Sequence, residues 1–269
     1  MTTRAVILAR GLGTRMRQPA PGAALDPAQE AAAAGGLKAF IPIGRPFVDY
    51  VISALADAGL TRVCLVIGPE HDMVGRYYRD QVALSRVEVG IALQEEARGT
   101  ADAVLAAEAW TSGEPFLVLN ADNYYPVEAL AELAALSLPG LIAFDRQGLL
   151  ADGQIPPERI LRYALLDLDG RRLRRIAEKP DAADAARFDR SPWVSMNCWR
   201  FDDRVFDACR AVPLSTRGEF ELPQAVQLAI DQGRFPLEAV FSHAGVLDLS
   251  GRADIAGVAA RLAGVQVRL

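Results

Sequence analysis

Over the first half of the chain, short runs of apolar residues alternate with segments in which apolar residues recur at helical spacing. The short runs predict buried strands, and they are Ala5–Ala9, Arg62–Ile67, Val87–Leu93, Pro115–Asn120 and Gly140–Phe144. The segments with helical spacing are Val48–Ala58, Thr100–Trp110 and Pro126–Leu136. Apolar strands that alternate with helices are typical of a largely parallel sheet covered by helices on both faces. The pattern therefore predicts an α/β fold.

The second half of the chain has a different pattern. Tyr163–Asp169 and Leu173–Glu178 flank the turn pair Asp169-Gly170 and predict a hairpin. The other expected strands are Pro192–Phe201, Leu237–Phe241 and Val246–Leu249, and the expected helices are Leu222–Gln232 and Asp254–Leu262. The alanine-rich stretch Gln18–Gly36 is consistent either with an inserted loop that holds a short helix or with a partly disordered segment.

Composition narrows the class of protein. The chain has 269 residues, 51% of them hydrophobic, which is enough for one sizeable core. Its net charge of -5 supplies no basic field for a nucleic acid, and no apolar run is long enough to cross a membrane. The three cysteines lack metal-ligand spacing and there are only two histidines, which argues against a structural zinc site. We expect reduced, buried thiols and a cytoplasmic protein.

The first predicted strand leads into the turn Gly11-Leu12-Gly13-Thr14-Arg15. Glycines let the backbone approach a ligand and point its amides at phosphate oxygens, and an arginine adds a planar, permanently charged fork for the same oxygens. A dinucleotide fingerprint would need glycine in place of Met16, and the lysine of a Walker loop is absent. The segment is therefore consistent with a phosphate-binding loop or with a plain strand-to-helix turn.

Polar residues also follow other predicted strands. Asp122 lies just beyond the strand that ends at Asn120, at the edge where open α/β sheets bind ligands. An acidic residue there commonly holds a divalent cation that bridges phosphates, although an Asx-turn would also account for it. Gln94 closes a strand, and its amide has the atoms to pair with a nucleobase. A helix cap at Gly99 or Thr100 is the simpler interpretation of this segment taken alone.

Three further charged sites have an ordinary surface role as their alternative. Lys38 precedes an apolar segment and a helix, Glu178-Lys179 ends a strand, and Asp248 ends another. Each is by itself compatible with a solvated side chain or a surface ion pair.

Together, nine motifs occur in a characteristic order along nearly the whole chain: LARGLGTRM, LKAFIPIGRPFVDYVISALADAGL, QEEARGTADAV, LVLNADNYYP, RYALLDLDG, IAEKP, SMNCWRF, RGEFELPQAV and VLDLSGRADI. With these motifs the chain resembles the sugar-1-phosphate nucleotidyltransferases, or nucleotide-sugar pyrophosphorylases. It is most similar to their glucose-1-phosphate thymidylyltransferase and uridylyltransferase branches. Each motif is weak alone, and their order and spacing carry the resemblance.

The resemblance implies a Rossmann-like three-layer α/β/α sandwich of the nucleotide-diphospho-sugar transferase type, with a mostly parallel mixed central sheet. It implies one nucleotidyltransferase domain over residues 1–269, with an insertion at 19–36 and no added C-terminal domain. The expected partners are a nucleoside triphosphate and a sugar 1-phosphate, with neither nucleic acid nor membrane. The oligomeric state is left open, and a homo-oligomer is among the states allowed.

The resemblance also implies a magnesium-dependent enzyme that forms a nucleotide-sugar and releases pyrophosphate. The implied nucleotide-binding residues are Gly11, Gly13, Thr14 and Arg15 for the triphosphate and Gln94, Gly99 and Thr100 for the base. The implied sugar-phosphate residues are Glu178, Lys179 and Asn197, and the implied magnesium ligands are Asp122 and Asp248. The implied catalytic cations are Arg15, Lys38 and Lys179.

The expected chemistry agrees with this set of residues. A phosphate monoester has a second pKa of about 6 and is mostly dianionic at neutral pH, so it needs no general base to attack the α-phosphate. The obstacle is repulsion between two anions, and cations that relieve it stabilise an in-line transition state. The scarcity of histidine is therefore no objection to an enzyme.

Several positions depart from the family pattern. Arg10 stands where the family usually has alanine or glycine against the nucleoside, Ala39 replaces a usual proline, and Val246 replaces a frequent tryptophan. These departures, with the insertion, leave the substrates open. Gln94 suits a uracil or thymine edge, but an amide also serves adenine.

Two other functions compete with an active enzyme. A non-catalytic regulatory relative that binds nucleotide-sugar would not need every charged group that is retained. A GT-A-type glycosyltransferase usually carries Asp-x-Asp at the strand end, whereas Asn120 stands at its first position here, and that class would leave the EKP motif unexplained.

Overall fold

The computed structural model describes the whole chain except residues 1, 12, 21, 154, 179–187 and 189–190. The strands are β1 (Arg4–Leu8), β2 (Arg62–Ile67), β3 (Glu88–Leu93), β4 (Phe116–Asn120), β5 (Asn123–Tyr124), β6 (Gly140–Asp145), β7 (Ala164–Asp169), β8 (Arg172–Ala177), β9 (Trp193–Phe201), β10 (Glu238–Ser242) and β11 (Leu247–Asp248). In the part described, nine of them form one sheet in the order β3-β2-β1-β4-β9-β6-β10-β8-β7, and β5 pairs with β11.

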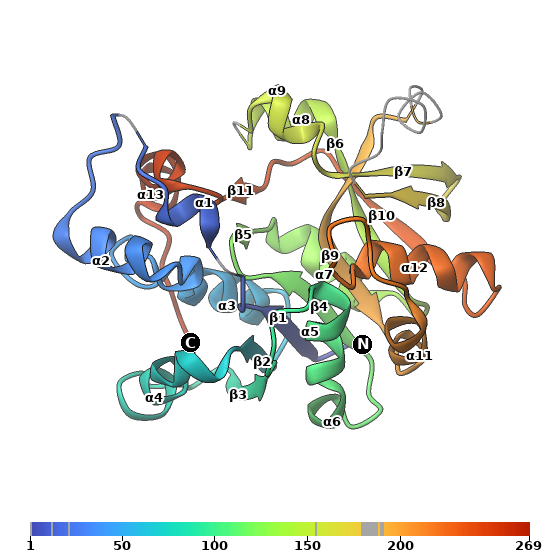
Figure 1. Cartoon of the computed structure of the whole chain (residues 1–269), viewed down its shortest axis with the longest axis horizontal. Coiled ribbons are helices and arrows are strands. Elements are labelled where there is room, and N and C mark those ends of the chain that lie inside the picture. The colour runs from blue at the N-terminus through green and yellow to red at the C-terminus, as the bar shows by residue number, and fades with distance from the viewer. Residues whose placement is uncertain (1, 12, 21, 154, 179–187, 189–190) are drawn as a thin grey trace.

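Helices cover both faces of this sheet (Figure 1). The α-helices are α1 (Thr14–Arg17), α2 (Pro27–Gly35), α3 (Phe47–Asp57), α4 (Asp72–Asp80), α5 (Thr100–Ala106), α6 (Glu108–Thr111), α7 (Val127–Ala135), α8 (Arg146–Ala151), α9 (Pro157–Ile160), α11 (Arg204–Ala211), α12 (Leu222–Asp231) and α13 (Ile255–Leu262). Short 3-10 turns are η1 (Lys38–Phe40), η2 (Pro69–His71) and η3 (Arg252–Asp254).

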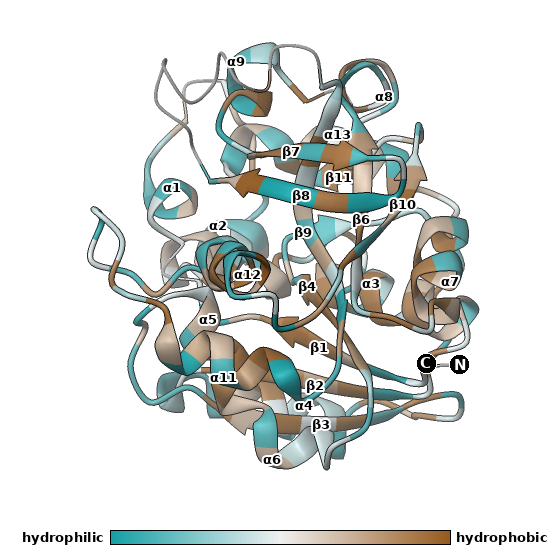
Figure 2. Ribbon diagram, turned by 90° about the vertical axis from the view of Figure 1, so that its right-hand side faces the viewer, coloured by the Kyte–Doolittle hydropathy of each residue, from teal (hydrophilic) through white to brown (hydrophobic). Residues whose placement is uncertain are grey.

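Two hydrophobic cores lie on opposite faces of the sheet. Successive residues of β1 point to opposite faces, so Ile7 packs in the core with α3, α4, α7 and α13, whereas Val6 packs in the core with α5, α11 and α12. Figure 2 shows β1, β2 and β4 as predominantly hydrophobic strands between these layers. This is the three-layer sandwich with a mixed central sheet that the sequence predicted.

The parallel half of the sheet sets the position of the site. β1 lies between β2 and β4, and β3 pairs with β2, all in parallel. The carboxyl ends of these strands therefore share one edge, where the chain continues toward Gly11, Gln94 and Asp122. β9 runs antiparallel between β4 and β6 and separates this half from the β7–β8 hairpin. The hairpin turns at Gly170, whose φ is +58°, as the Asp-Gly pair predicted.

The pairing of β9 with β6 is irregular. The register shifts between Leu141 and Ala143, whose partners Trp199 and Ser195 are four residues apart on β9. Asn197 lies inside this bulge with a φ of +54°, a left-handed conformation that asparagine tolerates better than most residues. Bulges of this kind re-aim a side chain, and this one turns Asn197 toward a pocket.

The alanine-rich insertion is ordered around α2. Asp26 accepts a hydrogen bond from the Gln29 amide, the Gln29 side chain accepts one in return, and Pro27 opens the helix. Gly36 closes it in a left-handed conformation. The loop with a short helix is therefore the correct alternative over the residues described.

Other boundaries differ from the predictions. The helix predicted over Thr100–Trp110 breaks at Ala107 into α5 and α6. Over the residues that the structure describes, four helices were not predicted: α4, α8, α9 and α11. In α4 the buried residues are Val74 and Tyr78 alone, so its hydrophobic stripe is too narrow to be evident in the sequence.

Two expectations from composition can be compared with the structure. All three cysteines are buried and unbridged, and burial raises the pKa of Cys64 and of Cys209 to about 12, which keeps both thiols protonated. Among the residues that the structure describes, every helix falls short of what a membrane-spanning helix needs.

Candidate active site

A pocket of about 240 Å³ opens at the carboxyl ends of β1, β3 and β4. We call it the strand-end pocket. The predicted residues that line it are Gly11, Lys38, Gln94, Gly99, Thr100 and Asp122. It lies where an open α/β sheet is expected to bind its ligand.

The glycine turn packs closely against the insertion. Gly13 precedes α1 with a φ of +61°, and a Cβ there would lie 2.1 Å from the Gly36 carbonyl oxygen. Gly11, in contrast, has open space where its Cβ would be and lines the strand-end pocket. Glycine is thus required at position 13 by packing, whereas Gly11 leaves room for a ligand. Thr14 is the first residue of α1.

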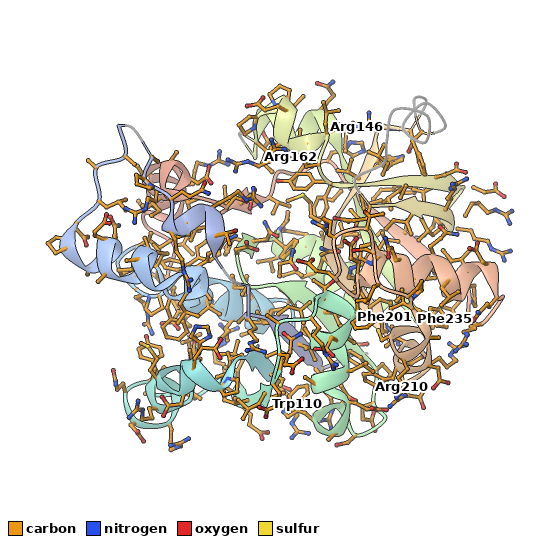
Figure 3. The ribbon with its side chains drawn as sticks, viewed as in Figure 1. Trp110, Arg146, Arg162, Phe201, Arg210 and Phe235 are labelled. Carbon is orange, nitrogen blue, oxygen red and sulfur yellow. The ribbon has the colours of Figure 1, made fainter. Side chains whose placement is uncertain are left out.

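A second pocket of about 110 Å³ adjoins the first. We call it the bulge pocket because Asn197 of the β9 bulge lines it. Its other predicted residues are Arg15, Glu178, Asp122 and Asp248. Arg162 also lines it and is labelled in Figure 3 near α8 and α9. Lys179, the remaining predicted site residue, lies outside the described residues.

The two pockets share Asn120 and Asp122. At this junction Lys38 Nζ lies 2.9 Å from Asp122 Oδ2, and both side chains are largely buried. The 3-10 turn η1 places Lys38, and the end of β4 places Asp122. A cation and an anion are therefore held together where ligands in the two pockets would meet.

Asp248 is enclosed by hydrogen-bond donors. Arg159 donates to its Oδ2 over 3.1 Å, Tyr163 over 2.9 Å and the Ser250 hydroxyl over 2.8 Å. Burial is the main cause that raises the pKa of Asp248, the negative charge of Asp122 adds to it, and these donors oppose it. The two carboxylates are thus close enough to repel each other.

None of these donors was assigned a role from the sequence. Tyr163 and Ser250 lie within the motifs RYALLDLDG and VLDLSGRADI, so the motifs themselves were the available signal. Arg159 had no such signal, since it reaches Asp248 across 89 residues of sequence. Its second partner is Asp254 at 3.0 Å, so the same guanidinium also holds the turn before α13.

Arg10, whose role the sequence left open, lies in the wall of the strand-end pocket. Its guanidinium donates to the main-chain carbonyl of Gln94 and forms an ion pair with Glu70 at 3.4 Å. The side chain is 11% exposed. Arg10 therefore ties the ends of β1, β2 and β3 together instead of extending freely into the pocket.

Thr100 has a structural bond as well as a place in the pocket. Its hydroxyl oxygen accepts a hydrogen bond from the backbone amide of Leu222 over 2.8 Å, which joins α5 to α12. Gly99 precedes α5 with a φ of +119°, and a Cβ there would lie 2.4 Å from the Phe220 carbonyl oxygen. Both residues thus also meet a packing requirement.

The geometry defines a class of site: two adjoining pockets at a sheet edge, with cationic side chains near their junction. Arg15 and Lys38 suit anionic ligands. Within the described part of the chain, no group of three or more His, Cys, Asp and Glu side chains is placed to hold a metal ion. The site is therefore a pair of adjoining pockets whose charge and position suit two anionic ligands side by side.

The chain belongs to the nucleotidyl transferase family, whose sequence profile matches residues 33–251. This confirms the family resemblance inferred from the motifs. The bifunctional protein GlmU of Pelotomaculum thermopropionicum is 28% identical over 264 residues, which cover 95% of this chain and 51% of GlmU. The chain thus spans about half the length of that relative.

Two other comparisons agree with this family. The UTP–glucose-1-phosphate uridylyltransferase AglF of Haloferax volcanii is 26% identical over 237 residues, which cover 86% of this chain and 85% of AglF. The crystal structure of a UDP-glucose pyrophosphorylase complexed with UDP-glucose superposes with a TM-score of 0.75 at 16% identity, covering 99% of this chain and 100% of that one. At that identity the likeness confirms the fold.

Proposed function

We propose that the protein is a nucleotidyltransferase that condenses a nucleoside triphosphate with a sugar 1-phosphate to a nucleotide-sugar and pyrophosphate. The observation that carries this proposal is the junction of two pockets at Asp122 and Asn120. The strand-end pocket would hold the nucleotide through Gly11 and Gln94. AglF is named a glucose-1-phosphate uridylyltransferase and the structural neighbour a UDP-glucose pyrophosphorylase, and both names support a sugar phosphate as the acceptor.

The bulge pocket would hold the sugar 1-phosphate. Glu178 and Asn197 line it and offer polar atoms to sugar hydroxyls. Arg15 lines the same pocket, so its guanidinium is available to the phosphates where the two ligands meet. Lys179 is proposed as a further phosphate ligand on the strength of its motif alone.

Asp122 and Asp248 are the proposed magnesium ligands, and their chemistry fits this role. Both line the bulge pocket, and the charge of Asp122 contributes to the raised pKa of Asp248. A divalent cation would relieve this repulsion. Mg²⁺ is usually bound by one or two carboxylates together with substrate phosphates, so a larger protein cluster is unnecessary. When bound, it would neutralise charge on the phosphates.

The residues of the chain would act by position and charge. A phosphate oxygen of the sugar 1-phosphate attacks the α-phosphorus, the bond to the β-phosphate oxygen breaks, and pyrophosphate leaves. Lys38, now paired with Asp122, lies at the junction where the attack would occur. Its ammonium would stabilise charge on the transferring phosphoryl group. Positioning both ligands in one site lowers the entropic part of the barrier.

The test is pyrophosphate release from a matrix of nucleoside triphosphates and sugar 1-phosphates, with and without magnesium. We expect release that needs one particular pair and magnesium. A variant with Arg76→Lys, an exposed position on α4, serves as the control for handling and folding. Release from no pair, with nucleotide-sugar binding still seen by calorimetry, would favour the regulatory relative instead.

A further inference from the structure

The Gln94 side chain is bound on its nitrogen. Nε2 donates to the Gly99 carbonyl over 3.1 Å and to Asp102 Oδ2 over 2.8 Å. Asp102, in the first turn of α5, is itself held by Arg98 at 2.6 Å. An amide nitrogen has two hydrogens, so both donors of Gln94 are used within the protein.

The chemistry of these partners fixes which way the amide faces. The carbonyl oxygen of Gly99 and an ionised carboxylate are acceptors only, so the nitrogen and not the oxygen of Gln94 must face them. An asparagine or serine at 102 would itself be compatible with either end of the amide, whereas the aspartate, like the Gly99 carbonyl, is compatible with the nitrogen alone.

The amide oxygen is left for a ligand. None of the described residues donates a hydrogen bond to Gln94 Oε1. Among the described residues, the fully buried side-chain atoms without a partner are His71 Nδ1, Arg146 Nε and Arg200 Nη1, and Gln94 Oε1 is not one of them. Solvent therefore reaches Oε1, although the residue as a whole is only 4% exposed. Gln94 lines the strand-end pocket, so that pocket is the open space beside it.

We propose that Asp102 is a positioning residue that fixes Gln94 with Oε1 as a hydrogen-bond acceptor toward the nucleobase, so that the pocket selects a base that presents an N–H there. This inference rests on the proposed function and deepens it. Asp102 touches Gln94 and not the base, because it does not line the pocket.

The fixed amide narrows the class of nucleotide. Uracil and thymine carry an N3–H between two carbonyl groups, which suits a lone acceptor. A glutamine pairs with adenine through both its oxygen and its nitrogen, and here the nitrogen is engaged. Cytosine presents a lone pair at N3, which would face the Oε1 lone pairs. The structure therefore favours a uracil or thymine edge over adenine.

The test compares UTP with N3-methyl-UTP, which lacks only the N3 donor, by titration calorimetry with magnesium present. For the unmodified protein we expect UTP to bind about tenfold more tightly, which corresponds to about 1.4 kcal/mol. In Asp102→Ala the preference for UTP should fall to about threefold or less, because the amide is then held by the Gly99 carbonyl alone. Glu96→Gln, an exposed change in the same segment, should keep the full preference.

Asp102→Asn has the same shape and covers the case in which the alanine variant fails to fold. Its preference for UTP over N3-methyl-UTP should lie between that of the unmodified protein and that of Asp102→Ala. An unchanged UTP preference in whichever Asp102 variants fold would overturn the role of Asp102, as would an unmodified protein that binds both nucleotides equally. If the unmodified protein binds none of UTP, dTTP, CTP, GTP and ATP, the proposed function itself fails.

Discussion

Lys38 and Asp122 are joined by an ion pair of 2.9 Å at the junction of the two pockets, although 84 residues separate them in sequence. The chain contains 27 arginines but only two lysines, Lys38 and Lys179. Both lysines lie in motifs attributed to the site. A chain that otherwise uses arginine thus has lysine only within these two motifs.

This arrangement predicts that Lys38→Arg is not a conservative change. The planar guanidinium is larger and its charge more diffuse, so it cannot hold the same position against Asp122 and reach a phosphate. We expect kcat for pyrophosphate release to fall by about a hundredfold, the scale of losing one electrostatic contact to the transition state. The control is Arg76→Lys, and turnover of Lys38→Arg within about threefold of normal would contradict the assignment.

The two aspartates should separate catalysis from stability. Asp122→Asn should remove most turnover with little change in thermal unfolding, because the Asp122 side chain pairs with Lys38 in the described part of the chain, and the pair is not fully buried. Near-normal turnover of this variant with saturating magnesium would rule out its proposed role as a metal ligand.

Asp248→Asn should lose turnover and stability together. The new amide nitrogen would face donors from Arg159, Tyr163 or Ser250, and an unsatisfied buried group costs about 1–3 kcal/mol. We expect the midpoint of thermal unfolding to fall by about 2–4 °C for each kcal/mol at this chain length. Equal unfolding midpoints for the two aspartate variants would show that the donors around Asp248 contribute no stability.

Gly11→Ala should affect the ligand and leave the fold intact. Its Cβ would meet nothing within 4 Å, and it would project beside the strand-end pocket. We expect KM for the nucleotide to rise about tenfold through the loss of close approach, with unchanged thermal unfolding. Gly257→Ala, at an exposed helical position that is also unobstructed, is the matched control and should not change KM. A normal KM in Gly11→Ala would place the nucleotide elsewhere.

Arg10→Ala should weaken the nucleotide pocket without impairing the chemical step. Its side chain supports the main chain at Gln94 and pairs with Glu70. We expect KM for the nucleotide to rise about three- to tenfold while kcat stays within about twofold. Glu70→Gln removes the ion pair but leaves the bond to Gln94, so its effect should be smaller. A fall in KM would instead show that Arg10 obstructs the ligand.

The first-half strands and the positions of their polar ends could be predicted because they depend on local pattern. The strand predicted at Arg62–Ile67 has the observed bounds, and Asp122 follows β4 as expected. The helix α4 could not be predicted, because much of its stability comes from the contacts of Val74 and Tyr78 with the core and not from a wide apolar stripe. The β9 bulge that turns Asn197 into its pocket likewise requires β6 beside it.

The sequence by itself determined the α/β class, the order of the motifs and the family, because periodicity and motif spacing are properties of the chain alone. The tertiary structure decided which side chains are partners. It paired Lys38 with Asp122, surrounded Asp248 with Arg159 and Tyr163, and bound both donors of the Gln94 amide. Apart from those of Gln94, these contacts join segments more than 80 residues apart. The orientation of the Gln94 amide depends on the acceptors that surround it in the fold. Such choices follow from packing in three dimensions, which no local pattern encodes.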